Sequence, residues 1–177
     1  MVSEKLPSRE QALQILRESQ CSVNVIKHCK AVAKLALETA EACKAKGLNV
    51  DFELVEIGAL LHDIGRSKTH TVHHAVVGAE IAKLAGLPEP VISIIKRHVG
   101  GGITTSEAKQ LGWPKDVYVP VTLEEKIISY ADKLVENSNR VPVEIVIETL
   151  SNELKHDAAE RVRKLHNEIA ELSGDDQ

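Results

Sequence analysis

Hydrophobic positions recur at helical spacing along most of the chain. The clearest stripe lies between residues 23 and 45, where apolar residues are three or four apart, as on one face of an α-helix. Its members are Val25, Ile26, Cys29, Val32, Ala33, Ala36 and Ala40. A β-branched run at 143–147 could be read as a strand, but no partner strand is visible elsewhere in the sequence. We therefore predict helix there as well.

Start and stop signals divide the chain into helices. Ser8 to Gln11 and Thr122 to Glu125 are capping boxes, in which the first and fourth residues satisfy each other's backbone N–H groups. Gly65 is predicted to cap the end of the third helix. The predicted helices are 8–18, 23–45, 51–63, 74–84, 88–98, a short one from 104, one from 122, and a stretch over 142–173. No repeat, low-complexity segment or linker interrupts them, so we expect one all-α domain over residues 1–177.

The last helical stretch carries a second apolar stripe with charged residues between its members. That stripe comprises Val146, Leu150, Leu154, Val162, Leu165, Ile169 and Leu172. A stripe of this kind either packs on its own domain or pairs with a second chain. We favour packing on the domain, with a homodimer as the alternative.

Composition narrows the class of protein. Hydrophobic residues make up 43% and aromatic residues 2% of the chain, so the core must consist of Leu, Ile, Val and Ala, which suits helices packed on helices. The formal charge of −4 gives no sign of a general nucleic-acid surface. The three cysteines form no Cys-x-x-Cys pair, and no apolar run is long enough to span a membrane or act as a signal core. We expect a soluble cytoplasmic protein with reduced thiols and no membrane partner.

His62 and Asp63 stand side by side at the end of an apolar run that begins at Glu56. Adjacent helical residues diverge by about 100°, so both side chains cannot point to solvent from a helix buried on most sides. A charge in such surroundings is normally paired or bound to a metal. The pair is therefore either a metal site at a helix end or a core histidine beside a solvated carboxylate.

Further residues that can bind a metal lie on other predicted helices. They are His28, His74, His98 and Asp132. Four imidazoles and two carboxylates form a nitrogen and oxygen set that suits iron, manganese, nickel, cobalt or zinc, whereas a structural zinc site more often uses thiolates. We expect one or two divalent ions as the cofactor.

The order of these residues resembles a known family. His28, then His62-Asp63, then Asp132 is similar to the H…HD…D pattern of HD-domain metal-dependent phosphohydrolases, and residues 62–65 read His-Asp-Ile-Gly, the HDIG form. The resemblance covers about residues 23–136, with 142–173 as a C-terminal helical extension. His74, which opens a His-x-x-x-Gly segment, and His98 resemble the additional ligands of two-metal members.

The resemblance implies a fold, a cofactor and a reaction. The fold is an HD-domain helical bundle, closest in sequence pattern to bacterial hydrolases of diadenosine tetraphosphate. His28, His62, Asp63 and Asp132 would hold one ion, while His74 and His98 would hold a second, with Asp63 bridging. The reaction would be hydrolysis of a phosphoester or phosphoanhydride of a nucleotide by metal-activated water. No Gly-Tyr-Pro motif follows the His-Asp pair, which argues against a cyclic di-GMP phosphodiesterase of the HD-GYP type.

Basic residues near these positions are candidates to bind a small phosphorylated substrate. They are Arg66, Lys68, Arg97 and Lys133. We prefer Arg66, whose planar guanidinium can hold two oxygens, and we assign it a catalytic role together with Asp63. The glycines at 100–102 either form a turn or offer backbone N–H groups as an anion nest.

Two other functions remain open at the level of sequence. Mixed-valent di-iron oxygenases use the same scaffold and ligand set, and an air-sensitive near-infrared iron spectrum with oxygen-dependent product would identify one. A non-catalytic metal or nucleotide-binding module would form a tight nucleotide complex that never turns over. The presence of all six ligand positions argues against such a module.

Overall fold

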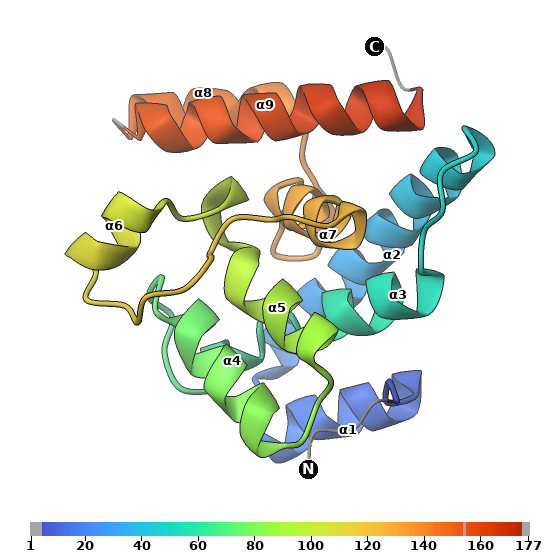
Figure 1. The fold of residues 1–177 in the computed structure, drawn as a ribbon, viewed down its shortest axis with the longest axis vertical. Coiled ribbons are helices and arrows are strands. Elements are labelled where there is room, and N and C mark those ends of the chain that lie inside the picture. The colour runs from blue at the N-terminus through green and yellow to red at the C-terminus, as the bar shows by residue number, and fades with distance from the viewer. Residues whose placement is uncertain (1–4, 154, 175–177) are drawn as a thin grey trace.

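The computed structural model describes residues 5–153 and 155–174 and is helical almost throughout (Figure 1). Its elements are α1 (Arg9–Glu18), α2 (Val23–Ala45), α3 (Phe52–Leu61), the 3₁₀ helix η1 (Ile64–Ser67), α4 (His74–Leu84), α5 (Glu89–Arg97), the 3₁₀ helix η2 (Val99–Gly101), α6 (Thr105–Gln110), α7 (Leu123–Lys133), β1 (Val135–Glu136), β2 (Asn139–Arg140), α8 (Val143–Asn152) and α9 (His156–Ser173). The prediction of an all-α fold is confirmed.

Helix starts follow the predicted capping signals closely. The Ser8 hydroxyl accepts a hydrogen bond from the Gln11 N–H at 3.2 Å, and Thr122 does the same for Glu125 at 3.2 Å. Each bond satisfies one of the N–H groups that the first turn of a helix leaves without a partner. Pro88 differs slightly from expectation, because it is the N-cap of α5 rather than a residue of its first turn.

Helix α3 lies at the centre of the core and packs against α1, α2, α5 and α7. Its second half is buried on all sides, which agrees with a run that lacks charged residues from Ile57 to Leu61. A Cβ added to Gly58 would lie 2.5 Å from Ile94 Cδ1 and 3.0 Å from Ile128 Cδ1. The glycine therefore lets α5 and α7 approach α3 closely, and this packing fixes the helix ends that carry the site.

A small antiparallel hairpin was not predicted. Strands β1 and β2 pair Val135 with Arg140 and Glu136 with Asn139, directly after α7. Asn137, at the turn, has a φ of 57°, a left-handed conformation that asparagine tolerates better than most residues. Strands of two residues are too short to show an alternating pattern, so they could not be predicted from hydrophobic periodicity.

The C-terminal stretch is two helices rather than one. Helix α8 packs against α9, and α9 packs against α2, α7 and η2, so Figure 1 shows the pair along one side of the molecule, opposite α1. Leu154, which we placed in the apolar stripe, lies outside the described residues. The α9 part of the stripe packs on the domain: Val162, Leu165 and Ile169 are buried there.

Polar contacts hold α9 on the domain as well. The Tyr130 hydroxyl lies 2.6 Å from His166 Nδ1, and Lys126 pairs with Glu168 at 2.6 Å. His166 of α9 is thus partly buried against α7. Among the residues that the structure describes, no helix has the length and apolar character needed to cross a membrane.

Removal of α9 is expected to destabilise the protein severely. Truncation after Ser151 would expose the surface that Val162, Leu165 and Ile169 cover, and each such side chain contributes about 1.5–3 kcal/mol by burial. The sum approaches the whole net stability of a domain. Circular dichroism melting should show little or no cooperative transition for the truncated chain.

A single substitution tests the packing of α9 with a smaller expected effect. Leu165→Ala should lower the free energy of unfolding by about 2–5 kcal/mol, whereas Arg163→Ala, at an exposed position of the same helix, should change it by less than about 0.5 kcal/mol. Equal melting temperatures for the two variants would show that α9 is not a structural part of the domain.

Candidate metal centre

Six side chains from five helical segments converge on one buried point. His62 and Asp63 follow the last turn of α3, His28 comes from α2, His74 opens α4, His98 follows α5, and Asp132 lies near the end of α7. His62, Asp63, His74 and His98 are at most 3% exposed. The structure therefore brings together all six residues that the sequence marked as metal ligands.

Two glycines allow His74 to reach Asp63. A Cβ on Gly65 would lie 1.9 Å from the carbonyl oxygen of His74, and one on Gly78 would lie 3.1 Å from the Gly65 nitrogen. Backbone meets backbone here, so no side chain fits. The prediction that Gly65 caps a helix was wrong: α3 ends at Leu61, and Gly65 belongs to η1 without a positive φ. Its role is close approach between η1 and α4.

Every imidazole in the cluster is held in the same way. The Nδ1 atoms of His62, His74 and His98 lie 2.6, 2.7 and 2.7 Å from backbone carbonyl oxygens three residues earlier. Nδ1 of His28 lies 2.9 Å from the carbonyl oxygen of Asn137 in the hairpin. A carbonyl can only accept, so each Nδ1 carries a proton and donates it. In a neutral ring, Nε2 then presents its lone pair to the centre.

The Nε2 lone pairs point toward one another, and in the described part of the chain no N–H group lies between them to form a hydrogen bond. The Nε2 atoms of His74 and His98 are 3.0 Å apart, although both rings already use their proton at Nδ1. Among the described residues, His62 Nε2 and Asp63 Oδ1 are buried side-chain atoms that lack a hydrogen-bond partner. Acceptors that are crowded together and buried are costly unless a cation lies among them. The residues therefore fit divalent metal ions.

The ligand atoms fall into two groups that share Asp63. We call His28, His62 and Asp132 the first half-site: Asp132 Oδ1 lies 3.0 Å from His28 Nε2 and 3.3 Å from His62 Nε2. We call His74 and His98 the second half-site.

Asp63 faces both half-sites with different oxygens. Its Oδ2 lies 3.8 Å from Nε2 of His28 and of His62. Its Oδ1 lies 3.1 Å from His74 Nε2 and 3.4 Å from His98 Nε2. A carboxylate placed in this way can bridge two ions, as the sequence pattern suggested for Asp63.

The protonation states also suit metal binding. Burial lowers the pKa of His98 to about 4, so the ring is neutral at neutral pH. Burial alone would raise the pKa of Asp63, but the imidazoles of His62, His74 and His98 that surround its oxygens hold it well below its usual range. The pKa of Asp132 is likewise held low against burial, chiefly by the charge of Lys133. His62 is the exception: burial would lower its pKa, but the charge of Asp63 raises it well above its usual range, so a metal ion that binds this ring would displace a proton. Neutral imidazole and ionised carboxylate are the forms that ligate metals.

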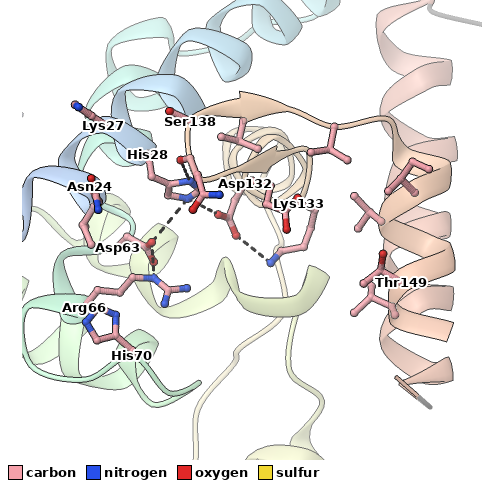
Figure 2. Close-up of a pocket in the computed structure, with 18 of the residues that line it drawn as sticks. Asn24, Lys27, His28, Asp63, Arg66, His70, Asp132, Lys133, Ser138 and Thr149 are labelled. Atoms are coloured by element: carbon pink, nitrogen blue, oxygen red, sulfur yellow. Dashed lines mark hydrogen bonds and ion pairs between the residues drawn. The ribbon is translucent and has the colours of Figure 1, made fainter. Parts of the chain in front are cut away.

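Two basic side chains contact the carboxylates at the outer edge of the centre. Arg66 Nε donates to Asp63 Oδ2 at 2.6 Å, and Lys133 Nζ lies 3.1 Å from Asp132 Oδ2 (Figure 2). Both line the pocket that opens on the metal ligands. Each cation is therefore placed where an anionic substrate would meet the metal centre.

The other predicted phosphate-binding groups lie elsewhere. Arg97 donates to Glu125 at 2.8 Å and to the carbonyl oxygen of Val117 at 3.3 Å, and neither it nor the exposed Lys68 lines the pocket. The glycines at 100–102 also lie outside the pocket lining, and a Cβ on Gly101 would meet the backbone of Arg161 in α9 at 3.6 Å. Their left-handed φ angles serve a turn that α9 covers, which argues against an anion nest at this site.

The pocket has a volume of about 690 Å³ and lies between α2, η1, the hairpin and α8. Sequence reasoning missed most of its walls, including Asn24, Lys27, Asn137 and Ser138. Lys27 adjoins His28 and could have been noted for that reason. The hairpin was not predicted, and the helix predicted over α8 could not be placed at the pocket, because only tertiary packing brings these two elements opposite the candidate metal ligands. His70, which the sequence placed in a loop, also lines the pocket.

Fold and ligand set together define a class of protein. The HD domain family model matches residues 25–137, and the chain belongs to that family. The match spans all of the metal ligands, from His28 to Asp132.

Particular relatives differ in their names. An uncharacterized protein of Methanocaldococcus jannaschii is 48% identical over 92% of this chain and 97% of its own length. A tRNA (cytidine(56)-2′-O)-methyltransferase of Picrophilus torridus is 40% identical over 97% of this chain, which spans 49% of that protein. A ribonuclease Y of Acidothermus cellulolyticus is 43% identical over 42% of this chain and 15% of its own length.

Solved structures share the fold. The HD domain of the phosphodiesterase PgpH from L. monocytogenes, in complex with cyclic di-AMP, superposes with a TM-score of 0.52 at 24% identity, covering 94% of this chain and 97% of that one. A second crystal structure of the same domain gives a TM-score of 0.50 at 23% identity. At this identity the likeness establishes the architecture alone.

The second half-site leads to a measurable prediction. Protein stripped of metal and reloaded with Mn²⁺ should approach two ions per chain, and His74→Ala should approach one, because that ring is a ligand of the second half-site only. His156→Ala, which removes an exposed histidine at the start of α9, should keep two. Metal analysis by mass spectrometry measures both variants, and wild-type protein that saturates at one ion would reject the two-ion arrangement.

Proposed function

We propose that this protein is a metal-dependent phosphohydrolase that cleaves a phosphoester or phosphoanhydride of a nucleotide. One observation carries the proposal: Asp63 faces two half-sites of imidazole Nε2 atoms, with Arg66 and Lys133 beside the carboxylates at the mouth of a pocket. Such a centre has ligands for two metal ions, and beside them it has basic side chains that can bind a phosphate.

Each residue has a distinct task in this proposal. His28, His62 and Asp132 would hold one ion, while His74 and His98 would hold another, with Asp63 between them. When bound, divalent ions supply Lewis acidity toward phosphoryl oxygens and lower the pKa of water. The backbone carbonyls behind the four rings keep each imidazole in the tautomer that binds metal.

Arg66 would orient the phosphate. Asp63 fixes the guanidinium through Nε at 2.6 Å, and Arg66 carries two further NH₂ groups on the same planar fork. Lys133, held by Asp132 at 3.1 Å, would add a second positive charge at the pocket wall. A phosphate bound here would lie beside the ligands rather than replace one of them.

The test is a substrate panel on metal-stripped protein reloaded with Mn²⁺ or Fe²⁺. The panel contains nucleoside mono-, di- and triphosphates, 3′,5′- and 2′,3′-cyclic nucleotides, cyclic dinucleotides, dinucleoside polyphosphates and short oligoribonucleotides, with products separated by chromatography. We expect metal-dependent hydrolysis of at least one class, abolished by chelation. Absence of turnover across the panel, together with a stable nucleotide complex, would replace the proposal by a binding module.

Two observations guide the choice of panel members. The sequence resemblance to hydrolases of diadenosine tetraphosphate supports dinucleoside polyphosphates. The relatives named as a tRNA methyltransferase and a ribonuclease Y support substrates derived from RNA, such as cyclic phosphates and oligoribonucleotides. An oxygen-dependent product formed only by the iron-loaded protein would instead indicate a di-iron oxygenase.

A further inference from the structure

The wall opposite the metal centre is unusually apolar for a site that attracts phosphate. Helix α8 turns one face to the pocket, and its residues there follow helical spacing: Ile145, Val146, Thr149 and Leu150. Val141, just before the helix, extends the same surface. Figure 2 shows Thr149 on α8 facing Asp132 and Lys133 across the pocket.

Part of this face packs on the core, since Val146 and Leu150 are partly buried against it, but part of it does not. Helix α8 also carries Val143, which is buried. Ile145, by contrast, keeps 48% of its surface exposed although it lines the pocket, across from the metal centre. A single exposed apolar residue is ordinary, but a group of them lining a pocket with a few polar neighbours is typical of a ligand site.

The pocket is therefore polar at one end and apolar at the other. Arg66 and Lys133 lie beside the metal ligands, while Ile145 and Leu150 lie on α8. Between the two ends, the hairpin and α2 line the pocket with side chains that can form hydrogen bonds, namely Asn24, Lys27, Glu136, Asn137 and Ser138. Glu153, directly after α8, is a charged residue of the otherwise apolar end. The volume of about 690 Å³ lies in the range of small-molecule sites.

We infer that α8 and the hairpin form a nucleoside subsite, in which the apolar face of α8 packs on the base and the hairpin tip meets its polar edge. The inference rests on the proposed function and adds to it the part of the substrate that confers specificity. A nucleobase has an apolar flat face and a rim of donors and acceptors, and this pocket offers both kinds of surface beyond the phosphate end. An inorganic polyphosphate or a sugar phosphate has nothing to place against Ile145.

The experiment compares two ligands that differ only in the nucleoside and that resist hydrolysis. They are α,β-methylene-ADP and methylenediphosphonate, in which a methylene bridge replaces the anhydride oxygen, titrated by calorimetry into Mn²⁺-loaded protein; chromatography of the titrated sample checks that the 5′ ester of the nucleotide stays intact. The wild-type chain should bind the nucleotide at least tenfold more tightly. Ile145→Asn removes apolar surface without adding charge and should weaken binding of the nucleotide about tenfold while changing that of methylenediphosphonate less than about twofold.

A matched control removes an exposed apolar residue from another surface. Leu84, on α4, is 87% exposed and lies outside the pocket lining, so Leu84→Asn should change neither affinity. Because Ile145 is half exposed, its variant should melt within a few degrees of wild type, and Ile145→Ser provides a second test should the asparagine variant melt lower.

The possible results distinguish the nucleoside subsite from the proposed phosphohydrolase function. Equal wild-type affinities for the two ligands, or an equal loss for both in Ile145→Asn, would overturn the nucleoside subsite and leave the phosphohydrolase proposal intact. Binding of neither ligand by the metal-loaded wild type would overturn both. A preference for the nucleotide that Ile145→Asn abolishes supports the subsite even before any substrate is turned over.

Discussion

Asp63→Ala is expected to lose both metal ions and all measurable activity on the true substrate. Asp63 is the one ligand whose two oxygens face different half-sites, at 3.1 and 3.4 Å on one side and 3.8 Å on the other. Its removal takes negative charge from the place where two cations would lie closest. Metal content and turnover should therefore fall together.

The melting temperature of the protein should depend on bound metal. A ligand that binds only the native state at a free concentration one hundred times its Kd contributes about 2.7 kcal/mol, so wild-type protein should melt higher with Mn²⁺ than without it. Asp63→Ala should show no such increase. Asp116→Ala is the matched control, because it removes a surface carboxylate that pairs with Lys96 at 2.7 Å, away from the site, and should keep metal and activity. Retention of two ions by Asp63→Ala would exclude the bridging role.

Arg66→Ala is expected to give the opposite pattern, with metal retained and activity lost. The guanidinium donates to Asp63 Oδ2, so it competes with a cation for that carboxylate rather than supporting metal binding. Loss of a charged donor to the phosphate should cost on the order of 2–4 kcal/mol, or roughly 30- to 1000-fold in rate. A fall in kcat would indicate contact made mainly in the transition state, and a rise in KM would indicate contact made already in the ground state.

Arg140→Ala supplies the control for Arg66. Arg140 is an exposed arginine of β2 near the pocket but outside its lining, and its removal should leave kcat and KM within about twofold of wild type. Should Arg66→Ala turn over the true substrate normally, the phosphate would lie nearer Lys133, which holds the equivalent place beside Asp132.

The sequence predicted the long helices well because their periodicity is strong. The predicted range 23–45 is that of α2, and the capping boxes mark the starts of α1 and α7. The six residues that converge at the candidate metal centre could also be picked out from the sequence, since the His-Asp pair and the other four follow a family pattern in order. These features are local or ordered along the chain, so a single sequence contains them.

Features that depend on tertiary packing could not be predicted from the sequence. Arg97, the last residue of α5, was predicted to bind phosphate because it adjoins His98. It pairs instead with Glu125, whose other carboxylate oxygen accepts from the backbone N–H groups of Val121 and Thr122. Gly65 looked like a helix cap and instead allows two backbones to touch. In each case a partner distant in sequence decides what the residue does.

The hydrogen bond behind His28 sets that ligand apart from the other three. His62, His74 and His98 take their carbonyl partners from the same local turn, but the partner of His28 is Asn137, 109 residues further along the chain. The tip of the hairpin thus completes the first half-site from behind while its side chains line the pocket in front. A substrate whose binding strengthens this hydrogen bond would raise the affinity of the first half-site for its ion, and the bound ion would raise the affinity for that substrate by the same factor.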